Sequence, residues 1–168
     1  MKRFVAIVVA IWIVTIVNFT EAATVQRIVV VNESARWNQK VNPEKFPSEV
    51  LRLVNLERAK VGAAPLKFAD DLAASALVRA RELPLKFSHT RPNGSSCFTA
   101  MPQTAGQHIL GENLAGGQIT PKQVVQAWMD SKSHRDNILN KEFKEIGIAY
   151  YYKANTKYKH YWVQHFRG

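Results

Sequence analysis

This 168-residue chain contains a single cysteine, Cys97. A single cysteine excludes an intrachain disulfide, so a packed hydrophobic core must stabilise the protein instead of covalent cross-links. The chain is long enough to bury such a core as one domain. A lone cysteine in a serine-rich loop is more often a packing residue than a nucleophile, and we assign Cys97 no chemical role.

Several functional motifs are also missing. The sequence has no Gly-x-Ser-x-Gly elbow, no His-Glu-x-x-His helix and no phosphate-binding glycine loop. It has no internal repeat. Its formal net charge is +10, but the lysines and arginines are scattered and no DNA- or RNA-binding motif accompanies them, so we expect no nucleic-acid partner. The charge favours association with anionic surfaces such as teichoic acids, lipid headgroups or acidic glycans.

The N-terminus has the pattern of a signal peptide. Lys2 and Arg3 precede an apolar run from Phe4 to Val17, which is shorter than the about 20 residues that a spanning helix needs. Small residues at Ala22 and Ala23 offer a cleavage site, so we predict a signal peptide at residues 1–22 and a secreted protein. An uncleaved membrane anchor is the alternative. Cleavage removes two cations and one anion from the net charge of +10 and leaves +9.

The remaining chain divides into an extended leader at residues 23–46 and one domain at residues 47–168. Hydrophobic spacing and capping residues predict helices at 48–61, at 70–83, from Thr120 onward and at 133–139. Residues 85–89 form a candidate strand within a long loop that extends to residue 119. Residues 146–152 and 158–166 predict an antiparallel hairpin, which would pair with that strand. This order predicts an α+β fold in which helices cover a small antiparallel sheet.

Three polar segments contain candidate functional residues: His89, Glu112 and His134. Two histidines and a glutamate suffice to bind a divalent metal with an open water position, or to transfer protons. His134 lies in the first turn of a predicted helix, where the helix dipole favours its neutral form. Each residue could also be a structural hydrogen-bonding group, because spacing alone does not bring the three together.

An ordered set of short motifs between Leu51 and Phe166 resembles the CAP superfamily, which comprises cysteine-rich secretory, antigen 5 and pathogenesis-related 1 proteins. The resemblance is closest to the bacterial SCP-like extracellular branch. The matching motifs are Val54-Asn55-Leu56-Glu57-Arg58, Pro65-Leu66, Phe87-Ser88-His89, Gly111-Glu112-Asn113-Leu114-Ala115, Ala127-Trp128, Ser133-His134-Arg135-Asp136-Asn137-Ile138-Leu139, Glu145-Ile146-Gly147-Ile148-Ala149 and Tyr161-Trp162-Val163-Gln164.

The resemblance implies an α-β-α sandwich with a central cleft that binds zinc or another divalent cation in some family members. By motif, His89 and His134 match the two family histidines, which are the possible metal ligands, and Glu112 matches the first glutamate. Ser131 stands where many members have a second glutamate, which makes the site less anionic and metal binding weaker. Ser131 and Asn113 are expected to line the cleft.

Two functions are weighed below, and a third alternative is a secreted protein whose domain only supports assembly on the cell surface. The first is an extracellular binding module, expected to be monomeric, for a lipid, a cell-wall glycan or a protein, with the metal optional. The second is a metal-dependent hydrolase, protease-like, in which His89 and His134 hold the metal and Glu112 is the general base. The absence of a nucleophile motif and the serine at position 131 favour the binding module over an enzyme.

Overall fold

The computed structural model describes residues 42–102 and 109–168. The predicted signal peptide at 1–22 and residues 23–41 of the predicted leader lie outside the described residues. The last five leader residues belong to the folded unit, which begins at Asn42. Phe46 is the reason: its ring is buried and stacks on Trp162 with 5.2 Å between ring centroids.

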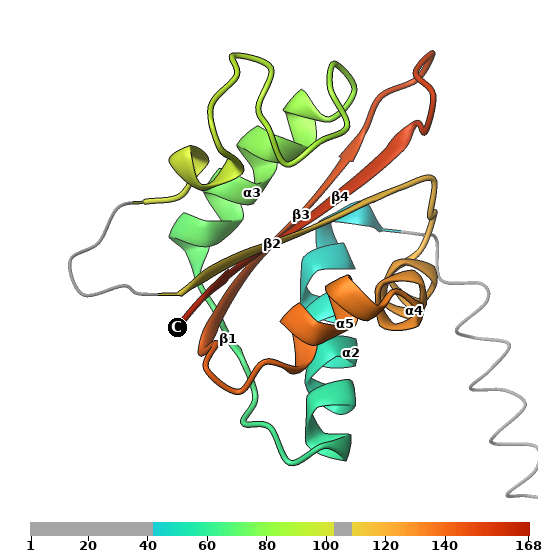
Figure 1. Ribbon diagram of the computed structural model, residues 1–168. Coiled ribbons are helices and arrows are strands. Elements are labelled where there is room, and N and C mark those ends of the chain that lie inside the picture. The colour runs from blue at the N-terminus through green and yellow to red at the C-terminus, as the bar shows by residue number, and fades with distance from the viewer. Residues whose placement is uncertain (1–41, 103–108) are drawn as a thin grey trace, which may run out of the picture. The chain divides into compact units, whose positions relative to one another are not determined.

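The described residues form helices and strands that are labelled in Figure 1. The helical elements are η1 (Pro43–Lys45), α2 (Phe46–Lys60), α3 (Asp70–Glu82), η2 (Cys97–Ala100), α4 (Pro121–Asp130) and α5 (Lys132–Leu139). The strands are β1 (Lys67–Phe68), β2 (Leu110–Gly116), β3 (Glu145–Tyr152) and β4 (His160–Arg167).

The four strands form one sheet in the order β1-β3-β4-β2. β4 is antiparallel to both β3 and β2, and only the short β1 runs parallel to its neighbour β3. The hairpin predicted from the aromatic C-terminal segments is confirmed as β3 and β4, with Tyr152 opposite His160.

Helices cover both faces of this sheet, with α3 on one side and α2, α4 and α5 on the other (Figure 1). Each side has its own core. The larger core is built around Trp128 and Trp162, and the smaller one joins Ala76 and Ala80 of α3 to Val163. The small alanine side chains let α3 approach the sheet closely. The predicted α+β sandwich is confirmed.

The strand that pairs with the β3–β4 hairpin along β4 is not the one we predicted at residues 85–89. Those residues are irregular, and the only nearby bridge among the described residues joins Thr90 to Ser96. β2 takes the edge position instead, although we assigned residues 110–116 to a loop. Its sequence, LGENLAG, is poor in β-branched residues, so pairing with β4 and burial override its weak strand propensity.

The predicted helix starts have mixed outcomes. Thr120 caps α4 as expected, because its hydroxyl accepts a hydrogen bond from the amide of Gln123. Ser48 does not cap α2, which begins two residues earlier; its hydroxyl donates to the carbonyl of Lys45 instead. α5 begins at Lys132 rather than Ser133. Val61, the last residue of the helix predicted at 48–61, lies after the last turn of α2 and is exposed.

A buried arginine joins α2 to the segment that follows α5. Arg58 donates from Nη1 to the carbonyls of Ile138 and Asn140, at 2.7 and 2.8 Å, and from Nε to the carbonyl of Ala64 at 2.7 Å. These carbonyls include the ends of α5, which have no partner within their helix. Arg58 therefore fixes where α5, and with it His134, lies against the sheet.

No helix within residues 42–102 and 109–168 is long and apolar enough to cross a membrane.

Candidate functional site

A compact loop after α3 holds His89 beside Cys97. The carbonyl of His89 accepts a hydrogen bond from the amide of Cys97 at 2.9 Å, and the amide of Arg91 donates to Ser95 at 2.8 Å. Gly94 closes the turn with a φ of 87°, a left-handed conformation that glycine adopts without strain. The loop thus returns on itself and places a thiol next to an imidazole.

Glu112 projects from the middle of β2 towards α3 and meets a ring of donors. Arg79 of α3 donates from Nε to Oε2 at 2.9 Å, and His165 of β4 lies with Nε2 3.1 Å from the same oxygen. His89 lies with Nδ1 2.8 Å from Oε1. Three segments that are remote in sequence, α3, the loop after it and β4, therefore contact one buried carboxylate on β2.

A second set of contacts holds these donors in place. The guanidinium of Arg79 also donates to Glu82 at 2.6 Å, and Glu82 in turn binds Arg91 of the loop at 2.7 Å. On the opposite side, the other nitrogen of His165 makes a 2.7 Å hydrogen bond with Ser75 of α3. Helix, loop and strand are thus connected through polar groups that are largely removed from water.

The electrostatics of the site follow from these contacts. Burial alone would raise the pKa of Glu112, but the hydrogen bonds from His165, His89 and Arg79 outweigh it and hold that pKa well below its usual range. Hydrogen bonding to Cys97 and to Glu112 raises the pKa of His89 to about 9. Burial lowers the pKa of His165. At neutral pH the site therefore contains a carboxylate, a protonated His89 and a neutral His165.

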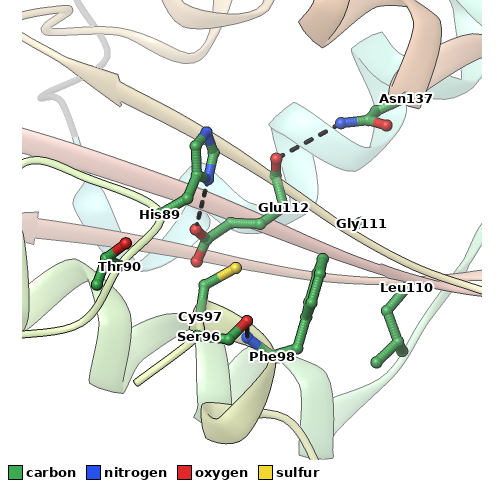
Figure 2. A pocket seen from close by; sticks show the side chains of 9 residues that line it. All are labelled: His89, Thr90, Ser96, Cys97, Phe98, Leu110, Gly111, Glu112 and Asn137. Carbon is green, nitrogen blue, oxygen red and sulfur yellow. Dashed lines mark hydrogen bonds and ion pairs between the residues drawn. The ribbon is translucent and has the colours of Figure 1, made fainter. Parts of the chain in front are cut away.

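His89 is one of the residues that line a cavity of about 430 Å³, whose lining side chains are drawn in Figure 2. One ring nitrogen of His89 faces Glu112, and the other points away from it. The side chain of His89 is 59% exposed, so this second nitrogen, Nε2, belongs to a ring that solvent or a ligand can reach. The cavity is lined by His89, Thr90, Ser96, Cys97, Phe98, Leu110, Gly111, Glu112 and Asn137.

His134 lies in the first turn of α5, as predicted, and burial together with the positive charge of His89 lowers its pKa. The lowered pKa favours the neutral form that we expected, although the dominant cause is burial. His134 is not among the residues that line the cavity.

Asn113 points to the opposite face of β2 from Glu112, because successive side chains alternate along a strand. It is fully buried, donates to the carbonyl of His134 and to Gln164, both at 3.0 Å, and accepts from Asn137 at 2.9 Å. Asn113 therefore anchors α5 to the sheet. We expected it to line the cleft, but it is not among the residues that line this cavity.

Ser131 links α4 to α5 and is partly exposed. We expected Ser131 to line the cleft. Instead α4 ends at Asp130, and the Ser131 hydroxyl lies 3.5 Å from that of Ser133. It does not line the cavity.

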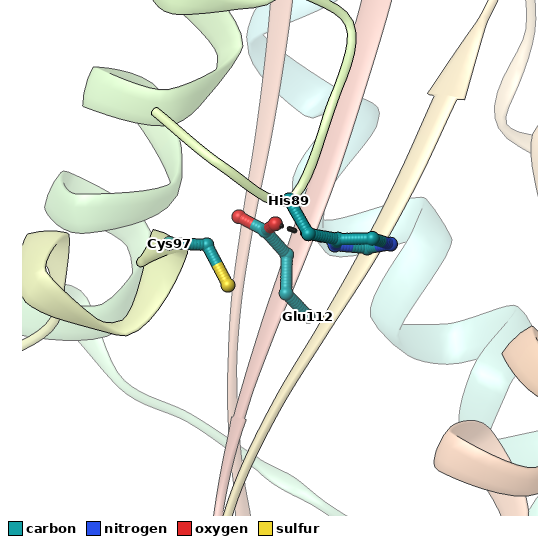
Figure 3. A group of neighbouring side chains, drawn as sticks. All are labelled: His89, Cys97 and Glu112. Carbon is teal, nitrogen blue, oxygen red and sulfur yellow. Dashed lines mark hydrogen bonds and ion pairs between the residues drawn. The ribbon is translucent and has the colours of Figure 1, made fainter. Parts of the chain in front are cut away.

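One nitrogen of His89, the sulfur of Cys97 and one oxygen of Glu112 lie within 4.8 Å of one another (Figure 3). These are metal-ligand atom types, but their surroundings fit a divalent cation poorly. Arg79 already neutralises Glu112 in the protein interior, and a metal would have to displace a proton from His89 or break its bond to Glu112. No step is therefore assigned to a metal.

The sequence did not reveal three residues of this site. Arg79 and His165 look like ordinary members of an amphipathic helix and an alternating strand, and only the buried charge of Glu112 required such partners. Cys97 looks like a loop residue because its closeness to His89 depends on the fold of the loop.

Known proteins resemble this chain in both sequence and fold. Residues 51–166 match the model of the cysteine-rich secretory protein family, CAP. The uncharacterized protein YkwD of Bacillus subtilis is 37% identical over 126 residues, which cover 73% of this chain and 47% of YkwD. The uncharacterized membrane protein YlbC of the same species is 26% identical over 64% of this chain and 33% of YlbC. The chain thus spans a third to about half of the length of these relatives.

Two solved bacterial structures share the fold. An outer surface protein of Borrelia burgdorferi superposes with a TM-score of 0.66 at 22% identity, over 77% of this chain and 96% of that one. An extracellular SCP-domain protein of Bacillus anthracis superposes with a TM-score of 0.63 at 21% identity, over 77% of this chain and 45% of that one. Together with the family match over most of the described residues, these similarities show that the chain belongs to the cysteine-rich secretory protein (CAP) family.

Proposed function

We propose that this protein is an extracellular binding module whose cleft recognises an oxygen-rich ligand, with the protonated His89 as the central donor. The observation behind this proposal is the pair of His89 nitrogens. Nδ1 is held by Glu112, and the raised pKa of about 9 keeps a proton on Nε2, which points away from Glu112 on a side chain that lines the cavity. A charge-assisted donor of this kind prefers carboxylate, phosphate or carbonyl oxygens. The names of the Bacillus anthracis and Borrelia proteins support an extracellular or surface location.

The same geometry disfavours hydrolysis with Glu112 as general base. A general base needs a free lone pair and a pKa near the working pH. The oxygens of Glu112 are occupied by Arg79, His165 and His89, and its pKa is well below the usual range. Glu112 therefore acts here as the group that orients and charges His89.

The cavity favours a glycan over a lipid or a protein ligand. Its volume of about 430 Å³ lies within the about 300–1,000 Å³ typical of small-molecule sites. Thr90, Ser96 and Asn137 supply polar groups, while the ring of Phe98 supplies an apolar wall. Sugar rings combine hydroxyl edges with apolar faces, so they match this lining. A carboxylate on the sugar would pair with His89.

Titration of the full chain with soluble acidic and neutral oligosaccharides, followed by calorimetry, tests the proposal. We expect acidic members to bind, and His89→Ala to weaken binding about 10- to 100-fold, because a hydrogen bond to a charged group contributes about 1.5–3 kcal/mol. His160→Ala is the matched control, since His160 lies on β4 outside the cavity lining. Equal affinity of wild type and His89→Ala for every glycan that binds would overturn the proposal.

The role of a metal is tested in the same instrument. Zn²⁺ added to metal-free protein at neutral pH is expected to bind weakly, because it competes with the proton on His89. Tight binding that both His89→Ala and His134→Ala abolish would instead favour a metal-centred function.

A further inference from the structure

Two segments far apart in sequence meet at one end of the sheet and expose apolar and cationic side chains together. We define the tip patch as residues 85–87, which follow α3, and residues 152–159, which form the tip of the β3–β4 hairpin. Phe87 and Tyr158 join the two segments, with ring centroids 4.9 Å apart. The end of α3 and the hairpin tip reach the same end of the sheet in Figure 1.

Large apolar groups of the tip patch remain in contact with water. Leu85 is 74% exposed, Tyr152 is 52% exposed and Phe87 is 43% exposed. Leu85 is the most exposed large hydrophobic residue among those the structure describes. Single exposed apolar residues are ordinary, but a cluster of them on one surface indicates a contact site.

Four exposed lysines, at positions 86, 153, 157 and 159, surround these apolar groups. None of them forms a salt bridge within the described part of the chain. The sequence has no aspartate or glutamate at positions 83–88 or 151–160. The nearest carboxylate along the chain, Glu82, is already paired with Arg79 and Arg91. The tip patch is therefore uniformly positive.

The backbone holds this arrangement in place. The amide of Lys153 donates to the carbonyl of Lys159 at 2.8 Å, which closes the tip. Asn155 and Lys159 both adopt left-handed backbone, with φ of 58° and 61°. Such a conformation is uncommon for lysine and directs the tip through a tight turn. Lys157 in addition lies 5.0 Å from the ring centroid of Tyr158.

We propose that the tip patch docks the protein on an anionic lipid bilayer. Lysines attract the negative headgroups, and leucine and aromatic side chains enter the interfacial region, where amphipathic rings are favoured. An anionic polymer would use the lysines but would leave Leu85 in water. This site is separate from the cavity at His89, and the proposal does not depend on the ligand of that cavity.

A fluorophore at the tip patch of the full chain tests the proposal. Because the chain begins with its own apolar run, a local reporter is needed rather than sedimentation of the whole protein. An environment-sensitive nitrobenzoxadiazole label is placed at Leu85→Cys, and as a control at Val61→Cys, an exposed apolar position at the far end of α2; both variants also contain Cys97→Ala. Phosphatidylcholine vesicles with and without phosphatidylglycerol are then added.

We expect a blue shift and a gain in intensity at position 85 only with the anionic vesicles, and no change at position 61. Adding Lys86→Gln and Lys153→Gln to the Leu85-labelled chain should raise the half-saturating lipid concentration about 25-fold, since each lysine near an anionic surface changes partitioning about fivefold. The matched charge control, Lys122→Gln with Lys141→Gln, should change it less than about threefold.

Three results would overturn the proposal. They are no shift at position 85 with anionic vesicles, an equal shift with pure phosphatidylcholine, and an equal shift at position 61. Binding of dextran sulfate that depends on Lys86 and Lys153, with no blue shift on vesicles, would assign the tip patch to an anionic polymer and would also overturn it.

Discussion

Replacing Glu112 by glutamine should destabilise the fold far more than the loss of an ordinary ion pair. Arg79 and Glu112 have side chains that are 0% and 1% exposed, with Nε 2.9 Å from Oε2. Glutamine keeps the shape of glutamate but leaves the buried guanidinium of Arg79 without that negative charge. The NH2 group of the new amide, itself a donor, would also face the groups that donate to the Glu112 carboxylate. Breaking a buried pair in this way costs about 3–5 kcal/mol. Because Glu82 still pairs with Arg79, we expect the lower end, about 3 kcal/mol.

Urea unfolding of the full chain measures this cost, provided that the dependence on urea is unchanged. The control is Asp136→Asn, which removes a salt bridge of 2.6 Å between Asp136 and Lys132 at the surface. The Asp136 side chain is 57% exposed and that of Lys132 is 81% exposed. That variant should lose less than about 1 kcal/mol. Adding Arg79→Met to Glu112→Gln should cost about 1–3 kcal/mol less than the sum of the single changes. A loss at Glu112→Gln no larger than the control, or an additive double variant, would refute the reasoning.

Three further predictions concern packing, pH and metal. Gly147→Ala should unfold or severely destabilise the protein, because an added Cβ would lie 2.1 Å from the backbone of α3; circular dichroism melting checks this, and a wild-type midpoint would contradict it. The raised pKa of His89 means that its contribution to stability is present below about pH 6.5 and is lost as pH rises towards about 9, so wild type minus His89→Ala in urea should shrink over that range; a constant difference would exclude the assigned proton. EDTA should leave the melting midpoint unchanged, because Arg79 rather than a metal neutralises Glu112; a fall on chelation would reverse that assignment.

The sequence predicts those parts of the fold that local patterns determine. The second helix, predicted at 70–83, is α3 at Asp70–Glu82, because acidic residues begin it and small apolar residues line one face. The C-terminal hairpin follows from its aromatic and β-branched residues. β2 was missed because its glycines, glutamate and asparagine are poor strand formers that only tertiary pairing with β4 holds extended.

The candidate site was predicted in part. Glu112 and His89 meet, with Nδ1 2.8 Å from Oε1, while His134 does not line the cavity that they share. Asn113 faces the other side of the sheet from Glu112, because residues adjacent on a strand face opposite sides. Cys97 and Arg79 could not be predicted because they join the site through tertiary contacts that leave no spacing pattern in the sequence.

Nuclear magnetic resonance of the His89 ring tests the central claim most directly. The ¹⁵N shifts of Nδ1 and Nε2 in the full chain distinguish an imidazolium from a neutral ring. We predict that His89 carries protons on both nitrogens at pH 7.5, so that its Nε2–H is a charged donor to the ligand, and that the ring loses one proton and its charge with a midpoint near pH 9. A neutral His89 at pH 7.5 would contradict the proposal that an imidazolium recognises the ligand in this cleft.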